Sequence, residues 1–108
     1  ALYGITFEFD KADIRAESKP QLDEIVAFLK ANAQVSIVVA GHTDAKGAFD
    51  YNVDLSRRRA QSVVRALTSA GIAASRLTPF GAGMASPVAT NDSDDGRALN
   101  RRVEIVKR

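Results

Sequence analysis

The residues best suited to binding chemistry lie in one segment, Gly41–Ala60, which reads GHTDAKGAFDYNVDLSRRRA. Its polar side chains include the carboxylate of Asp44 just past the apolar run, an amide at Asn52 and three consecutive arginines at 57–59. An apolar run precedes it and a helical pattern follows, so these polar groups gather where a strand becomes a helix. A carboxylate and a guanidinium close together on such a junction suit a ligand with both an ammonium and a carboxylate, such as an amino-acid centre.

Helical periodicity narrows the choice among the arginines. Asn52 and Arg59 are seven positions apart and therefore share nearly one helix face, which borders the apolar stripe. Arg58 points away from that stripe and is expected to be a solvated surface charge. Arg57 flanks the stripe on its other side, so periodicity leaves Arg57 and Arg59 both open. Asp44 also has a second interpretation, as an acid that only stabilises its own turn.

The composition offers few of the residues that a catalytic or metal site would need. The chain has no cysteine and one histidine, His42, so no thiolate nucleophile, catalytic triad or zinc site can be assembled. We therefore expect no enzymatic activity, no cofactor and no metal, and a structural role for His42. The 15 basic and 13 acidic residues are interleaved and give a net charge of +2, which does not favour nucleic-acid binding.

The elements that must position this segment can be predicted from hydrophobic spacing. A first strand with one buried face is predicted from apolar residues that alternate with polar ones, namely Ile5, Phe7 and Phe9. The spacing of Ser18 to Gln21 is that of a capping box and predicts a helix that starts there and ends near Asn32. Val35–Ala40 is apolar at nearly every position, as expected of a central strand.

The second half of the chain predicts one long helix and two strands. The helix should run from about Asp50 or Tyr51 to Gly71, with a buried stripe of Val53, Ala60, Val63, Val64 and Leu67. Leu77–Phe80 is predicted to be a short strand at a sheet edge, because it contains Pro79. Residues 86–96 should form a surface loop with a helical turn near 94–99. A last strand should direct Val103 and Ile105 toward the helices.

These elements predict one domain over residues 1–108. Their order, β-α-β-α-β-β, predicts an α/β (α+β) two-layer sandwich with two helices on one face of a small mixed four-stranded sheet.

The motifs in this order resemble those of the OmpA-like peptidoglycan-binding domain, which occurs in outer-membrane anchoring proteins, peptidoglycan-associated lipoproteins and flagellar stator subunits. The resemblance covers almost the whole chain. It rests on the following segments: Phe7–Ile14, Gly41–Asp44 with Gly47, Tyr51–Asn52, Leu55–Ser56, Arg58–Ala60 and Asn100–Val103.

The resemblance implies a non-catalytic domain that binds the diaminopimelate residue of the peptidoglycan stem peptide. It selects Arg59 as the group that binds the carboxylate of the diaminopimelate side-chain centre, while Asp44 would bind its ammonium. Asn52 and Arg101 would line the same pocket. Backbone groups near Lys11 and Ala12 are expected to complete it.

The resemblance also implies a location in the Gram-negative periplasm, associated with the outer membrane and the cell wall. The chain begins at Ala1 without an apolar leader, which we interpret as an excised domain or a processed product. A membrane would then be reached only through a segment missing from this chain: a lipid anchor, a barrel or a transmembrane segment. Other envelope proteins are possible partners. The alternative function is a periplasmic protein-interaction adaptor of the same fold that does not bind the wall and uses a surface such as the 86–96 loop.

Overall fold

A computed structural model describes residues 4–85 and 89–108 and contains a mixed four-stranded sheet of order β1-β4-β2-β3. The strands are β1 (Gly4–Thr6), β2 (Ile37–Gly41), β3 (Leu77–Gly81) and β4 (Arg102–Lys107). β4 is antiparallel to both β1 and β2, whereas β2 and β3 are parallel. The mixed four-stranded sheet predicted from the sequence is thus confirmed.

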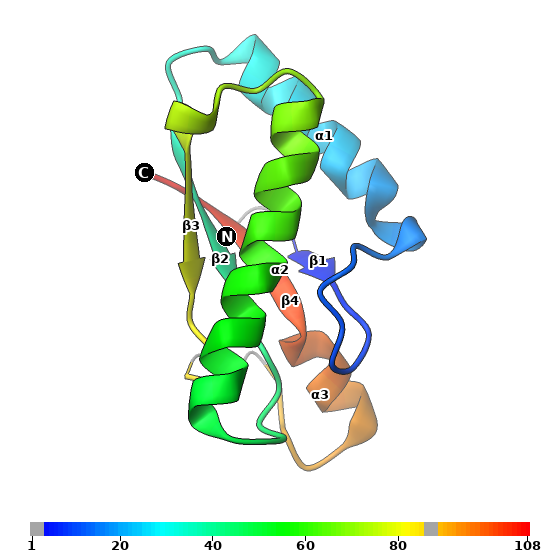
Figure 1. The fold of residues 1–108 in the computed structure, drawn as a ribbon. Coiled ribbons are helices and arrows are strands. Elements are labelled where there is room, and N and C mark those ends of the chain that lie inside the picture. The colour runs from blue at the N-terminus through cyan, green and yellow to red at the C-terminus, as the bar shows by residue number, and fades with distance from the viewer. Residues whose placement is uncertain (1–3, 86–88) are drawn as a thin grey trace.

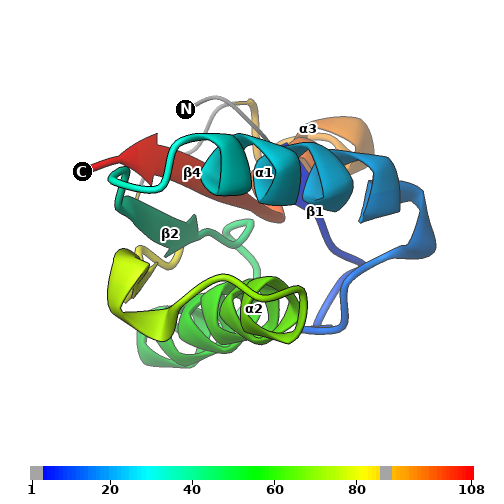
Figure 2. The same cartoon turned by 90° about the horizontal axis from the view of Figure 1, so that it is seen from above.

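The helices are α1 (Lys19–Ala31), α2 (Phe49–Ser69) and the short α3 (Asp94–Asn100), with 3₁₀ turns η1 (Ala16–Ser18) and η2 (Ala74–Arg76). Figure 1 shows α2 lying along the sheet with α1 beside it, and the view from above in Figure 2 shows the two helices apart from each other. The helical turn predicted near 94–99 is α3. No helix among the described residues is long and apolar enough to cross a membrane.

One hydrophobic core holds the two layers together. The sheet side contributes Ile5 of β1, Phe7 just after it, Ile37 and Val39 of β2, and Val103 and Ile105 of β4. The helices α1 and α2 contribute Ile25, Leu29, Ala60, Val63 and Leu67. Because α1 and α2 belong to the same cluster, both cover one face of the sheet, as the sequence predicted. Pro79 lies exposed in the edge strand β3, where its missing N–H costs no ladder bond.

The buried face of α2 differs from the predicted stripe in its first half. Val53 and Val64 are only half-buried, whereas Asn52, Leu55, Ser56 and Arg59 are buried. A hydrophobic stripe locates only apolar residues, and here the helix also buries polar side chains that bond to loops. The helix stops as predicted before Gly71, which takes the left-handed φ of 102° that favours glycine.

Two further predictions at the start of the chain were wrong. The first strand does not continue to Phe9, because its pairing with β4 ends at Thr6, and Phe9 is 55% exposed rather than buried. Asp10 then has a φ of 58°, which turns the chain out of the sheet direction. Ser18 does not cap α1 with its side chain, because η1 leads into the helix and gives Ser18 a helical backbone.

Of the predicted 86–96 loop, residues 86–88 lie outside the described residues, and the rest leads into α3. The Ser93 side chain caps α3 by accepting a hydrogen bond from the Gly96 N–H at 3.0 Å.

Candidate functional site

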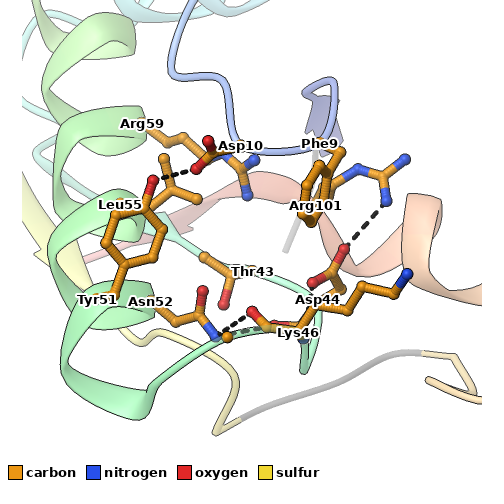
Figure 3. A pocket seen from close by; sticks show the side chains of 11 residues that line it. Phe9, Asp10, Thr43, Asp44, Lys46, Tyr51, Asn52, Leu55, Arg59 and Arg101 are labelled. Atoms are coloured by element: carbon orange, nitrogen blue, oxygen red, sulfur yellow. Dashed lines mark hydrogen bonds and ion pairs between the residues drawn. The ribbon is translucent and has the colours of Figure 1, made fainter.

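A cavity of about 240 Å³ opens where β2 ends, α2 begins and the β1–α1 loop and α3 approach them (Figure 3). Eleven residues from four parts of the chain line it: Phe9, Asp10, Thr43, Asp44, Lys46, Gly47, Tyr51, Asn52, Leu55, Arg59 and Arg101. The four residues predicted to bind a ligand, Asp44, Asn52, Arg59 and Arg101, all lie in this lining. Their role in binding stays a prediction.

Arg59 is a fully buried guanidinium at the inner end of the cavity, with 0% exposure. Its Nε donates to the carbonyl of Lys11 at 2.8 Å, and its two terminal nitrogens donate to the carbonyls of His42 and Glu8, each at 3.0 Å. The guanidinium also lies over the Phe7 ring, 5.2 Å from its centroid. Arg59 is therefore held in one orientation by two loops, β1–α1 and β2–α2, and further N–H groups of its five remain to bond a ligand.

The charge of Arg59 is poorly compensated within the protein. No carboxylate among residues 4–85 and 89–108 forms a salt bridge with it, although Asp44 acts on it at longer range. Burial lowers the pKa of the Arg59 guanidinium from its ordinary value to about 10, an effect that Asp44 opposes and Arg101 reinforces. At neutral pH the group stays charged, so the cavity contains a desolvated cation that an anionic group would stabilise.

Asp44 supplies the opposite charge on the loop after β2. Only 3% of the residue is exposed, and its two carboxylate oxygens have different partners. Oδ1 accepts the backbone N–H of Lys46 at 3.0 Å, as in a turn-stabilising aspartate, and Oδ2 accepts from Arg101 at 3.1 Å. The turn-stabilising interpretation of Asp44 is thus confirmed, and its role in binding a ligand stays a prediction. Each oxygen retains acceptor capacity toward the cavity.

Arg101 and Asn52 form hydrogen bonds that fix the backbone on either side of Asp44. The Nε of Arg101 donates to the carbonyl of Phe7 at 3.1 Å, so this arginine joins the β1 end to Asp44. The Asn52 amide donates to the carbonyl of Lys46 at 2.9 Å and fixes the loop from the side of α2. No hydrogen bond to the Asn52 side-chain oxygen is recorded within the described part of the chain.

The rim of the cavity contains aromatic residues that the sequence analysis did not assign to a site. Phe9 and Tyr51 are 55% and 45% exposed, and the Tyr51 hydroxyl donates to Asp10 across the opening. The sequence predicts Phe9 as a core residue, because its alternation with Ile5 and Phe7 continues the strand pattern. Tyr51 could have been predicted at the site, because it comes one position before Asn52 at the start of the helix.

The other predicted groups lie elsewhere. Arg57 is exposed, and Arg58 pairs with Asp54 at 2.9 Å outside the cavity. The carbonyls of Lys11 and Ala12 accept bonds from Arg59 and Ser62, so the backbone at these residues supports the site from behind rather than lining it.

His42 is a buried structural residue rather than part of the cavity. Its backbone N–H donates to the carbonyl of Arg102 at 2.7 Å and its carbonyl accepts from Arg59. Burial, reinforced by the charge of Arg102, lowers the pKa of the His42 imidazole below its usual 6.5, while Glu104 opposes the shift. The described residues contain no cluster of three or more His, Asp or Glu that could hold a metal ion.

Comparison with known proteins then assigns the chain to a family. The model of the OmpA family matches residues 6–101. The chain belongs to the OmpA family. It is 41% identical over 100 residues to outer membrane porin F of Pseudomonas fluorescens, covering 93% of the chain and 31% of that protein. It is 39% identical to the peptidoglycan-associated lipoprotein of Pseudomonas aeruginosa, covering 99% of the chain and 65% of the relative.

Solved structures of this family have the same fold. The peptidoglycan-associated lipoprotein of Burkholderia pseudomallei superposes with a TM-score of 0.93 at 30% identity, covering 97% of this chain and 89% of that one. The cell wall anchor of the T6SS from P. aeruginosa gives a TM-score of 0.78 at 38% identity, covering 94% and 73%.

The chain spans 31% of the P. fluorescens porin F, 51% of outer membrane protein A of Bordetella avium and 65% of the P. aeruginosa lipoprotein. By name these relatives are outer-membrane, peptidoglycan-associated and wall-anchoring proteins. The OmpA-like domain of this chain is accordingly a non-enzymatic, envelope-associated domain, as the sequence predicted.

Proposed function

We propose that this domain binds peptidoglycan non-covalently through the diaminopimelate of the stem peptide and so anchors an envelope protein to the cell wall. The observation that carries the proposal is Arg59, a buried guanidinium that borders an open cavity without a salt bridge from the described residues. Burying a charge is costly unless it is paired, so the site favours a ligand that brings a carboxylate to it.

A carboxylate alone would leave Asp44 unexplained. The side-chain centre of diaminopimelate carries an ammonium beside its carboxylate, and Asp44 has acceptor capacity in the same cavity (Figure 3). The aromatic rim of Phe9 and Tyr51, with Leu55 within, suits the aliphatic part of that side chain. Charge-assisted bonds contribute on the order of 1.5–3 kcal/mol each, which supports modest affinity per site. Because the wall polymer carries many copies of the ligand, the overall binding of the anchored protein would be stronger than the affinity of one site.

The names of several relatives add support at the level of the family. One is a peptidoglycan-associated lipoprotein and another is a cell wall anchor. The competing function is an adaptor that keeps the fold but binds only proteins, since one fold can serve several partners.

Sedimentation with purified sacculi separates the two functions. We expect the wild-type domain to sediment with sacculi and Asp44→Asn to remain largely in the supernatant, because the amide keeps the oxygen that accepts from Lys46 but loses the charge. Asp54→Asn makes the same charge change at an exposed site on α2 outside the cavity and should sediment like the wild type. A wild-type domain that stays in the supernatant would favour the adaptor.

A further inference from the structure

A second cavity of about 210 Å³ adjoins the first and extends from Asp44 toward α3. Its lining is Phe9, Asp44, Lys46, Asp94, Arg97 and Arg101. Four of these residues, Phe9, Asp44, Lys46 and Arg101, also line the first cavity. A ligand seated beside Arg59 therefore has a direct continuation into the second cavity.

The second cavity carries one cation more than its acids can neutralise. Three cations line it, Lys46, Arg97 and Arg101, against two acids, Asp44 and Asp94. Arg101 pairs with Asp44, and Arg97 pairs with Asp94. In the part of the chain that the structure describes, Lys46 has no acidic partner, and its ammonium lies 5.9 Å from the centre of the Phe9 ring. The excess charge is therefore that of Lys46.

The backbone of Lys46 is fixed from both sides. Its N–H donates to Asp44 at 3.0 Å, and its carbonyl accepts from the Asn52 amide at 2.9 Å. The root of the side chain is thus held at the boundary between the two cavities, and Figure 3 shows its ammonium beside the Asp44–Arg101 pair. A cation rooted in this way loses less freedom on binding than one on a mobile loop.

We infer that the second cavity binds a second carboxylate of the same stem peptide, and that Lys46 is its ligand. This inference rests on the proposed function. The residue joined to diaminopimelate in the stem is a γ-linked glutamate, whose α-carboxylate is not part of the peptide chain. In many walls that carboxylate is amidated, which removes its charge and leaves its size nearly unchanged. The domain should therefore distinguish free from amidated stems.

The test is titration calorimetry with two peptides, L-Ala-γ-D-Glu-diaminopimelate-D-Ala and its form with the glutamate α-carboxylate amidated. We expect the wild type to bind the free form about 2- to 5-fold more tightly, as for one exposed charge pair. Lys46→Gln should bind both forms with the affinity that the wild type has for the amidated one. The substitution leaves the backbone bonds of Lys46 in place, and Lys107→Gln, at the far end of β4, is the matched control.

Each outcome separates this inference from the proposed function. Binding of both peptides with equal affinity by the wild type would overturn the second carboxylate site while leaving diaminopimelate recognition intact. An equal loss of affinity for both peptides in Lys46→Gln would also overturn it, because Lys46 would then act on another part of the ligand. Failure of the wild type to bind either peptide would contradict the proposed function itself.

Discussion

Arg59 is the residue that defines the site. Its surroundings explain why helical spacing alone could not choose between Arg57 and Arg59. Periodicity placed both Arg57 and Arg59 beside the apolar stripe, yet one is exposed and the other completely buried. What decides between them is three backbone carbonyls, two from the β1–α1 loop and one from His42. Tertiary structure brings those carbonyls to Arg59, and the spacing of residues along one helix does not show which loops will pack against it.

His42 supplies a prediction about pH. Its pKa lies below the usual 6.5 in the folded protein, so the unfolded chain takes up a proton near pH 6.5 while the folded protein stays neutral. The stabilisation is full above about pH 6.5 and is lost as the pH falls toward the folded pKa. Urea denaturation should therefore show a free energy of unfolding that decreases from pH 7 to pH 5.

His42→Gln is the variant that isolates this contribution. It removes the titrating group, so its free energy of unfolding should change less between pH 7 and pH 5 than that of the wild type. The comparison concerns the slope and is insensitive to any constant loss of packing. Equal slopes for the two proteins would show that His42 titrates alike in the folded and unfolded chains.

The junction of β2 and α2 is the feature that matters at the scale of elements. A Cβ on Gly41 would lie 1.9 Å from the backbone carbonyl oxygen of Ser56, so the strand and the helix pack together only with glycine there. This contact fixes the distance between Asp44, just past the strand, and Arg59, one turn along the helix from Ser56. The sequence predicted both elements but could not show that their backbones touch.

Gly41→Ala should therefore force α2 away from the sheet. We expect the free energy of unfolding, measured by urea denaturation, to fall by roughly 1–3 kcal/mol, the typical cost of overpacking a core. Val38→Ile adds a methylene to the same strand at a half-buried position and should change stability by less than about 0.5 kcal/mol. A Gly41→Ala protein as stable as the wild type would mean that the two backbones separate without cost.

The fold of the whole molecule was largely predictable because each core element carries its own pattern. The stripe of α1, the apolar β2 and the alternating β4 specify a two-layer sandwich before any contact is known. The β1–α1 loop was not predictable, since Phe9 continues the alternation of a strand that has already ended. Its turn at Asp10, with a φ of 58°, is what brings Phe9 to the rim of the cavity.

The site was predictable only with the family resemblance. Composition and spacing indicated an acid and two candidate guanidinium groups. The resemblance selected Arg59, added Arg101 and predicted the ligand. The pairing of Asp44 with Arg101 joins residues 57 positions apart in the sequence. No local pattern reports such a contact.

The central claim is that the cavity recognises the charged side-chain centre of diaminopimelate, and changing the ligand tests it without disturbing the protein. This matters because Arg59 bonds three backbone carbonyls in two loops, so its replacement would weaken folding as well as binding. The measurement is calorimetric titration of the wild-type domain with two stem peptides that differ only in having diaminopimelate or lysine. Lysine lacks the carboxylate that Arg59 would bind.

Loss of a charge-assisted interaction of roughly 1.5–3 kcal/mol predicts that the lysine peptide binds about 10- to 150-fold more weakly. Equal affinity for the two peptides would contradict the proposed recognition of diaminopimelate.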